Sequence, residues 1–427
     1  MFLKILTKIL SFIDSIFFVM KITELSKNKA DFLIIQHTNN YGYIFNGKKY
    51  AHLTYSAYFY LKDMGHEVVF LDKPFSKFKR NKYYPCINVN FLFIFESLSN
   101  YVLRRVLGEN KSKEVRCMRR QAIWSQIIEK IKPKNIIGIQ PENTLCTVAK
   151  KNNIKIYDLQ HGVINKDHYW YGTQMHENSS DDELPTGILF WDEVSAKNIE
   201  YWTKNRNVKS VVVGNPWLNR FIQQNSEDEL VSQANNRLNF LVKNKPVILV
   251  SLQWGLSEKC YADSIYNYNG VMCKSLEDVI VRTADKYHWL LRLHPVQMNG
   301  KNAESINKYL NKTFGSFSNV EWVKSSEVAL PALLSVINLH ITDISTVVTE
   351  ATYFGVKSAL LNPFLEEGQK YESYFLHERQ QGFADIVEQK ADVIEAWIET
   401  NLEHTISNVK SNLVVDTKDG FIQLLRD

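Results

Sequence analysis

The stretch VINLHITDISTVVTEATYFGVKSALLNP, which runs from Val336 to Pro363, decides how this part of the chain folds. Its pattern predicts a strand at 336–341, a short loop, a helix that begins at Ser345, a break at Gly355 and a second strand at 358–362. A strand that turns directly into a helix brings backbone N–H groups and the positive end of the helix dipole together. The stretch therefore predicts an anion site, and a phosphate is the usual anion.

Side chains near the start of this helix suit the same ligand. Ser345 and Thr346 supply hydroxyl donors, and Glu350, about one turn later, can accept hydrogen bonds from ribose hydroxyls. Asp343 and Ser345 can also serve only as helix caps, and this simpler interpretation stays open for the stretch taken alone.

The composition indicates a large globular protein. A chain of 427 residues exceeds one ordinary core, so we expect two domains. The net charge of +5 indicates a basic face rather than a nucleic-acid-binding coat, so no nucleic-acid partner is expected. The five cysteines show no CxxC spacing, which argues against a zinc site or a disulfide framework and fits a reduced cytosol.

Two stretches are candidates for contact with an anionic membrane. Residues 1–22 carry apolar side chains at helical spacing beside lysines, but no run approaches the ~20 apolar residues of a membrane span, and no cleavage site follows. This predicts a helix that lies on a membrane surface or one that docks on the protein's own core. Residues 104–134 hold ten cationic and three acidic side chains, which suit anionic lipid or simply form a solvated helix face.

Alternating strand and helix patterns predict a first α/β region. Its expected elements are strand 31–36, helix 50–64, strand 67–71, strand 135–139, helix 141–152, strand 155–159 and strand 211–213. Loops at the carboxyl ends of such strands hold ligands. The loop after the first strand therefore supplies candidates for the acceptor side: His37, Asn39, Asn40 and Tyr41.

The strand at 155–159 ends in Gln160-His161-Gly162. Because Gly162 permits a tight turn, His161 is expected to project from the strand end. A neutral imidazole there can take a proton from an attacking hydroxyl, although a structural role for the histidine stays equally open. The polar and aromatic segment 163–171 predicts a sugar-binding loop.

A second α/β region begins with the buried-type strand 246–251, and Trp254 in the loop after it is a candidate binding residue. The next strand, 288–293, continues into His294 and Pro295. Alternation directs Arg292 and His294 to the same side, where two donors suit a phosphate or a nucleotide. Structural roles for both stay open.

These elements divide the chain into four parts. We expect a membrane-surface helix at 1–30, an acceptor-side Rossmann-like domain at 31–225 and a nucleotide-donor Rossmann-like domain at 240–390. Helices at 391–427 follow, and they can cross back to the first domain.

Three motifs together resemble a known group of enzymes. LRLHP at 291–295, DISTVVTEATYFGVKSALLNP at 343–363 and DLQHG at 158–162 look like bacterial surface-polysaccharide transferases of the GT-B fold. These include capsule and O-antigen glycosyltransferases and, more distantly, polysialyltransferases and teichoic acid glycerophosphotransferases. The resemblance implies an α/β fold of two Rossmann-like domains that face each other across a cleft.

The resemblance also implies roles for residues. His294, Ser345 and Thr346 would bind the phosphate of a nucleotide donor, Glu350 would hold its ribose or sugar, and His161 would be the base. One departure is Gln160, which stands where the teichoic acid enzymes usually have Trp. The acidic base motif of the sialyltransferases is not evident.

The expected function is therefore sugar transfer from a nucleotide-sugar donor to a glycan or lipid-linked acceptor in capsule or O-antigen synthesis. Neither a cofactor nor a metal is expected, because HxE and DxD spacings are missing. The expected location is the cytoplasmic face of the plasma membrane. Three alternatives stay open: polyol-phosphate transfer from a CDP donor, 2-epimerisation of a nucleotide sugar, and a non-catalytic glycan-binding subunit.

Overall fold

The computed structural model describes residues 30–37, 40–75, 81–166, 168–242, 244–253, 271–300, 302–403 and 414–426. The chain forms two compact units. The first unit contains the described residues up to Trp217 and those from Val415 onward, and the second contains those from Leu218 to Val414. The helix expected at 1–30 and the candidates Asn39 and Trp254 lie outside the described residues.

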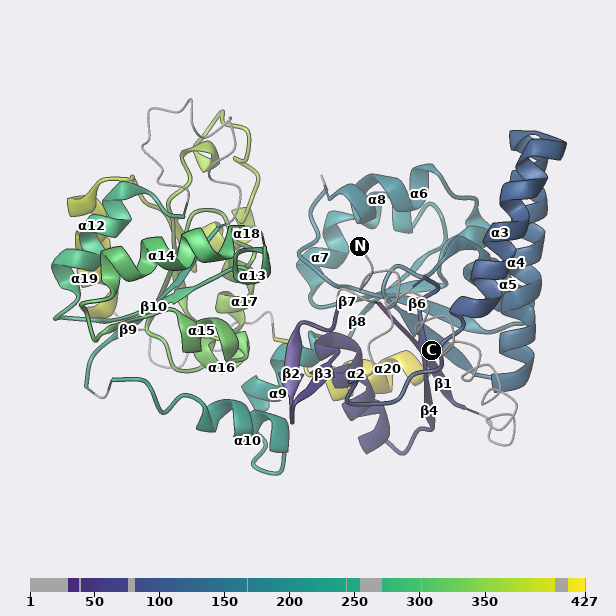
Figure 1. Cartoon of the computed structure of the whole chain (residues 1–427), viewed down its shortest axis with the longest axis horizontal. Coiled ribbons are helices and arrows are strands. Elements are labelled where there is room, and N and C mark those ends of the chain that lie inside the picture. The colour runs from purple at the N-terminus through teal and green to yellow at the C-terminus, as the bar shows by residue number, and fades with distance from the viewer. Residues whose placement is uncertain are drawn as a thin grey trace. The chain divides into compact units, whose positions relative to one another are not determined.

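The first unit is built on a six-stranded, fully parallel sheet of order β4-β1-β5-β6-β7-β8 (Figure 1). Its strands are β1 (Phe32–Gln36), β4 (Val68–Asp72), β5 (Asn135–Gly138), β6 (Lys155–Leu159), β7 (Gly187–Phe190) and β8 (Lys209–Val212). The strand order reverses beside β1, between β1 and β5. In open α/β sheets ligands bind at this point, outside the carboxyl ends of the strands.

Continuous apolar sequence explains these strands. All five residues of β1 are buried, as expected for a parallel sheet covered on both faces by helices. The helices of this unit are α2 (His52–Asp63), α3 (Asn90–Leu107), α4 (Glu109–Ile131), α5 (Asn143–Lys151), the π-helix η2 (Tyr169–Gln174), α6 (Met175–Glu177), the 3₁₀ helix η3 (Asp181–Glu183), α7 (Glu193–Asn198), α8 (Glu200–Thr203) and α20 (Thr417–Arg426).

Several elements of this unit were not predicted, among them a hairpin and one strand of the sheet. The segment taken as a loop after β1 contains an antiparallel hairpin, β2 (Tyr43–Phe45) and β3 (Lys48–Tyr50). Its turn consists of Asn46 and Gly47, which both have positive φ, the conformation that a two-residue hairpin turn requires. The strand β7 was also missed.

The second unit has a six-stranded parallel sheet of order β11-β10-β9-β12-β13-β14. Its strands are β9 (Val247–Ser251), β10 (His288–Arg292), β11 (Val320–Glu321), β12 (Leu339–Thr342), β13 (Lys357–Leu360) and β14 (Ala384–Ile386). Numbered along this unit, the order is 3-2-1-4-5-6, as in dinucleotide-binding folds. The order reverses between β9 and β12.

The helices of the second unit are α10 (Glu229–Asn236), α12 (Lys274–Thr283), α13 (Pro295–Asn299), α14 (Ala303–Phe314), α15 (Val323–Glu327), α16 (Leu330–Leu334), α17 (Val347–Tyr353), the 3₁₀ helix η4 (Pro363–Leu365), α18 (Leu376–Gln380) and α19 (Ala391–Glu403). The boundary between the units falls within α9 (Pro216–Gln223). None of the described helices is long and apolar enough to cross a membrane.

Several boundaries differ from the predicted ones. The strand expected at 336–341 begins only at Leu339, because Val336 and Ile337 still donate to the carbonyl of Leu333 at the end of α16. The helix expected at Ser345 begins two residues later. The helical stretch expected at 227–245 is helical only in α10, since consecutive asparagines, which are poor helix formers, lead into turns.

Candidate functional site

His161 lies two residues after the end of β6, at the carboxyl edge of the first sheet. Its Nδ1 is 2.9 Å from the hydroxyl of Tyr171, a fully buried residue of η2. Burial, together with the nearby carboxylate of Asp158 on β6, raises the pKa of this phenol well above its ordinary value. A carboxylate, a phenol and an imidazole therefore lie in series, with the imidazole at the more exposed end.

Asp158 is held from several directions. Its Oδ1 accepts from the backbone N–H of Gln140 at 2.9 Å, and its Oδ2 accepts from the indole of Trp170 at 3.4 Å. Lys73 follows β4, and its ammonium donates to the carbonyl of Gln140 at 2.7 Å. The carboxyl ends of three strands thus contribute to one polar cluster.

Burial shifts the pKa of both ends of this series. Burial, assisted by the positive potentials of His168, His37 and Lys73, lowers the pKa of His161 to about 4. Burial raises the pKa of Asp158 to about 7, against the lowering effect of its hydrogen bonds and of Lys73. At neutral pH the imidazole of His161 is therefore unprotonated and able to accept a proton.

The other candidates of the first unit have structural partners. The amide of Gln160 donates to the carbonyl of Gly162 at 2.9 Å and accepts from Trp191 N–H at 2.8 Å, so it shapes the turn that carries His161. His37 is partly buried after β1, and burial lowers its pKa to about 4. Tyr41 is buried, and its hydroxyl lies 3.4 Å from that of Tyr55, so it belongs to the core.

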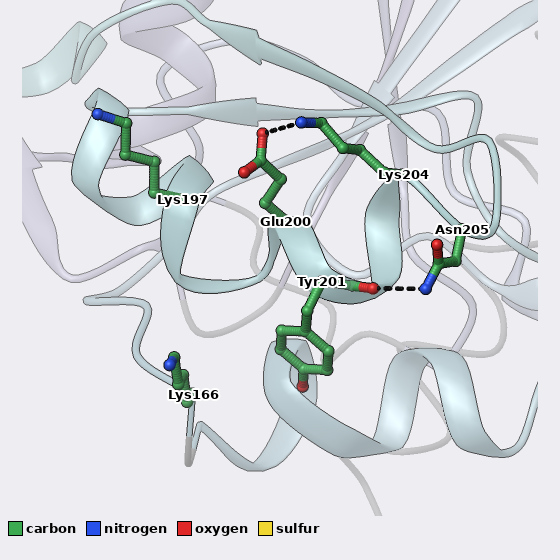
Figure 2. Close-up of a pocket in the computed structure, with 6 residues that line it drawn as sticks. All are labelled: Lys166, Lys197, Glu200, Tyr201, Lys204 and Asn205. Atoms are coloured by element: carbon green, nitrogen blue, oxygen red, sulfur yellow. Dashed lines mark hydrogen bonds and ion pairs between the residues drawn. The ribbon is translucent and has the colours of Figure 1, made fainter.

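The segment expected to bind sugar, 163–171, runs into the π-helix η2. A Cβ at Gly172 would lie 2.1 Å from the carbonyl oxygen of Lys166, so only glycine lets the helix pack on this loop. A surface hollow of about 540 Å³ borders the loop (Figure 2). It is lined by Lys166, Lys197, Glu200, Tyr201, Lys204 and Asn205, and Glu200 pairs with Lys204 at 2.7 Å. One side of the loop therefore carries positive charge.

In the second unit, Arg292, Ser251 and Thr342 occupy matching positions at the carboxyl ends of β10, β9 and β12. A small cavity opens where the strand order reverses. Its lining residues are Val250, Ser251, Leu252, Gln253, Val271, Met272, Cys273, Leu276, Thr342, Asp343 and Leu361. Of the predicted binding residues described in this unit, only Asp343 reaches this cavity.

Arg292 has a structural contact that the sequence did not reveal. Its Nη1 donates to the carbonyls of Ser325 and, at 2.8 Å, Val328, and this ties the end of α15 to β10. Burial lowers the pKa of Arg292 to about 10, while Glu350 opposes that shift. The guanidinium stays charged at neutral pH and acts on Glu350, whose pKa burial raises to about 7.

His294 is the N-cap of α13. Its Nδ1 accepts from the backbone N–H of Val296 at 3.2 Å, and the side chain of Gln297 accepts from the backbone N–H of His294 at 2.8 Å. Burial lowers the pKa of His294, so the ring is neutral at pH 7. A neutral ring that accepts at Nδ1 carries its proton at Nε2, where it is a donor.

The predicted anion stretch precedes α17, with Thr346 as its N-cap residue. The hydroxyl oxygen of Ser345 accepts from the backbone N–H of Val347 at 3.3 Å, which satisfies one N–H of the first turn although Ser345 is not the N-cap residue. Thr346 is exposed and Glu350 is partly buried. The carboxylate of Asp343 accepts from the amide of Asn362 at 2.5 Å.

Sequence reasoning missed several residues of these clusters. Asp158 sits inside an apolar strand, and an acidic residue at a buried strand position was a usable signal. His340 is another buried polar group, on β12 between the hydroxyls of Ser251 and Ser358, each 2.9 Å away. Nothing in the local pattern marked Tyr171 or Lys73, because their roles depend on contacts between distant segments.

No protein-family profile and no curated protein sequence matches this chain. Solved structures do match it. A UDP-GlcNAc 2-epimerase from Neisseria meningitidis, bound to UDP-GlcNAc, aligns with a TM-score of 0.56 at 12% identity over 93% of this chain and 99% of its own. The UDP-GlcNAc 2-epimerase from Methanocaldococcus jannaschii aligns with a TM-score of 0.57 at 13% identity, over 92% and 99%.

The wall teichoic acid polymerase TagF is similar at the same level. Its TM-score is 0.52 at 13% identity, and the alignment covers 98% of this chain and 95% of the polymerase chain. Identities this low establish a shared fold rather than a shared reaction. The chain therefore has the predicted α/β fold of the GT-B type, with two Rossmann-like units.

Proposed function

We propose that the protein transfers a sugar from a nucleotide-sugar donor to a hydroxyl of a glycan or lipid-linked acceptor in the synthesis of a surface polysaccharide such as capsule or O-antigen. The observation that carries the proposal is the His161–Tyr171–Asp158 series, which provides a neutral base at the ligand-binding edge of a Rossmann-like sheet. Support also comes from the shared fold, since the similar solved structures include complexes with UDP-GlcNAc and UDP and a soak with CDPG.

In the proposed reaction, the acceptor oxygen forms a bond to the anomeric carbon of the donor sugar. The bond from that carbon to the donor phosphate oxygen breaks, and the electron pair leaves with the phosphate. The acceptor proton passes to Nε2 of His161. His294, Ser345 and Thr346 stabilise the departing phosphate and Arg292 adds positive charge, whereas Glu350 contacts ribose or sugar hydroxyls. We propose that no metal takes part, so chelator is expected to leave the rate unchanged.

Two other reactions fit the same fold. The similarity to 2-epimerases favours isomerisation of the nucleotide sugar itself, and the similarity to a teichoic acid polymerase favours transfer of a polyol phosphate. Turnover of a nucleotide sugar without any acceptor would identify the epimerase. Consumption of a CDP-polyol with release of CMP would identify the phosphotransferase, because the attacked atom is then phosphorus.

Nucleotide binding is the first property to test. A thermal-shift panel with CMP, CDP, UDP, UDP-sugars, GDP and ADP is expected to stabilise the protein with one base, since a ligand at 100 times its Kd adds ~2.7 kcal/mol. His294→Ala and Ser345→Ala are expected to lose that shift. Ser305→Ala is the matched control, because this exposed serine lies in the first turn of another helix of the same unit.

Two outcomes would contradict this proposal. If no nucleotide stabilises the protein, the donor is not a nucleotide or the protein only binds glycans. If both variants keep the full shift, the donor phosphate binds elsewhere, and the cavity lined by Ser251 and Asp343 becomes the next site to test.

A further inference from the structure

Helix α3 exposes an apolar stripe to solvent. Phe95, Leu98, Val102 and Val106 are 70%, 64%, 60% and 73% exposed. Their spacing of three, four and four residues places them on one face of the helix. Large side chains gathered in this way mark a surface that contacts another apolar phase or molecule.

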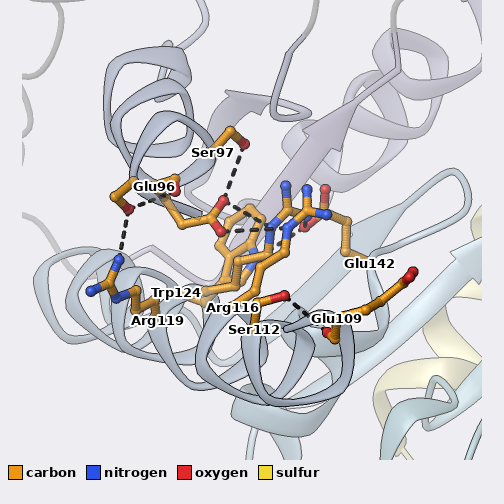
Figure 3. Close-up of polar contacts among 10 residues, drawn as sticks. Glu96, Ser97, Glu109, Ser112, Arg116, Arg119, Trp124 and Glu142 are labelled. Carbon is orange, nitrogen blue, oxygen red and sulfur yellow. Dashed lines mark hydrogen bonds and ion pairs between the residues drawn. The ribbon is translucent and has the colours of Figure 1, made fainter. Parts of the chain in front are cut away.

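The buried face of the same helix is polar as well as apolar. Phe93 and Glu96 are buried there, and Glu96 pairs with Arg116 at 3.4 Å and with Arg120 at 3.3 Å (Figure 3). The helix thus buries Phe93 together with a carboxylate and leaves valine, leucine and a second phenylalanine outward. An ordinary surface helix exposes polar side chains on that face, so the stripe is not explained by packing within the described part of the unit.

The helix that carries the stripe is attached to the rest of the first unit through α4 and α5. α3 and α4 run side by side, and α4 packs on α5 (Figure 1). Arg120 of α4 also pairs with Glu142 at 3.4 Å, and the indole of the fully buried Trp124 donates to the same carboxylate (Figure 3). Glu142 is the N-cap residue of α5, so these contacts fix the helix pair to the body of the first unit.

Positive charge surrounds the far end of this helix pair. Residues 104–120 contain seven lysines and arginines and two glutamates, a net charge as large as the +5 of the whole chain. Arg104 and Lys113 are well exposed, and Arg105 stacks over the exposed ring of Tyr101 at 4.7 Å. A tyrosine beside apolar and cationic side chains suits the boundary between headgroups and acyl chains.

We propose that the α3–α4 pair docks the protein on the surface of an anionic phospholipid bilayer. The stripe enters the boundary between headgroups and acyl chains, and the exposed cations Arg104, Arg105 and Lys113 contact lipid phosphates. Cationic side chains beside the apolar stripe favour a bilayer over a protein partner, because a bilayer has mobile anionic headgroups next to an apolar layer. The inference does not depend on the reaction proposed above.

Vesicle co-sedimentation tests the surface in the full chain. Vesicles of phosphatidylcholine with 30% phosphatidylglycerol are expected to bind the protein, and pure phosphatidylcholine vesicles to bind it at least tenfold more weakly. A stripe variant, Leu98→Ser with Val102→Ser and Val106→Ser, is expected to lose at least tenfold in partitioning to anionic vesicles. A variant with Arg104→Gln, Arg105→Gln and Lys113→Gln is expected to lose about fivefold for each cation in contact.

The control variant is Val323→Ser with Val336→Ser, two exposed valines of the second unit. It is expected to bind vesicles like the parent chain, and all variants are expected to keep the parent's nucleotide-dependent thermal shift. Equal vesicle binding by the stripe variant and the parent would overturn the proposal. So would a parent chain that ignores vesicles but sediments as a dimer that the stripe variant abolishes, because the stripe then contacts a second copy.

Discussion

The protonation state and tautomer of His161 depend on Tyr171 and Asp158, which lie on the buried side of its ring. When Asp158 is ionised, the Tyr171 hydroxyl can donate to it, and the phenol oxygen can then accept from Nδ1–H of His161. This arrangement leaves Nε2 as the proton acceptor and stabilises the imidazolium after proton transfer. Tyr171 and Asp158 are thus positioning residues, whereas His161 would contact the acceptor.

This arrangement predicts a specific pH profile. Because the pKa of Asp158 is raised to about 7, kcat/KM is expected to rise as the pH increases through about 7. The pKa of His161 is about 4, so its protonation is expected to lower kcat/KM further only near pH 4. Asp158→Asn is expected to remove the limb near pH 7 and keep nucleotide binding. His161→Ala is expected to lower kcat on the order of 10²- to 10⁴-fold.

His66→Gln provides the control, because this histidine of the same unit precedes β4 and lies beside Asp31, at the amino ends of the strands rather than at the edge that carries His161. Its profile is expected to match that of the parent. A limb near pH 7 that survives in Asp158→Asn would show that another group titrates there. A His161→Ala rate within about threefold of the parent would rule out the general-base role.

Among the secondary-structure elements, the middle of the second sheet contains a polar bridge. His340 lies on β12, and its two ring nitrogens are each 2.9 Å from a serine hydroxyl, Ser251 on β9 and Ser358 on β13. A neutral ring has one donor and one acceptor, so both hydroxyls are satisfied without charge. The bridge joins three neighbouring strands just below the candidate donor edge.

This bridge predicts acid sensitivity of the second unit. Burial lowers the pKa of His340 to about 3, below its ordinary 6.5, so the folded state binds fewer protons than the unfolded state between these values. The stability present above pH 6.5 is lost as pH falls, with a slope that approaches about 1.4 kcal/mol per pH unit well below 6.5. His340→Gln is expected to reduce the loss in unfolding free energy between pH 6.5 and 5.5 by about 1 kcal/mol.

Urea unfolding at both pH values measures this difference. The control is His377→Gln, a partly exposed histidine on α18, which is expected to keep the parent's pH dependence. If His340→Gln and the parent lose the same unfolding free energy between these pH values, His340 is not held neutral in the folded state.

At the scale of the whole molecule, the chain returns to the first unit after completing the second. α20 contacts α2 and β8, and Lys418 of α20 pairs with Asp63 of α2 at 2.6 Å. Gly420 lets the helix approach β8 closely, because a Cβ there would lie 2.5 Å from the Cα of Val213. The first unit is therefore complete only when the last residues have docked.

Gly420→Ala tests this dependence. Alanine favours a helix by about 1 kcal/mol over glycine, but the contact with backbone atoms is expected to cost more, for a net loss of about 1–3 kcal/mol. Thermal melting of the full chain measures it. Gln423→Ala, at an exposed position of the same helix, is expected to stay within about 0.5 kcal/mol of the parent. Stabilisation by Gly420→Ala would show that α20 is not tightly packed on β8.

The sequence by itself determined the elements whose pattern is local. Continuous apolar runs marked β1 and β9, because strands buried on both faces need such runs wherever they lie. The position of His161 after β6 was also readable, since strand ends in α/β folds lie at the ligand edge. Asn46-Gly47 carried a readable hairpin signal that was overlooked.

Only the tertiary structure decided which groups meet. It paired Tyr171 with Asp158 and His161 through a π-helix, directed Nη1 of Arg292 to backbone carbonyls, and turned the apolar stripe of α3 outward with Glu96 inside. The physical reason is that hydrogen bonds, desolvation and the pKa values they set depend on distances between segments far apart in the chain. Periodicity shows that a helix has two faces, and packing alone decides which face is buried.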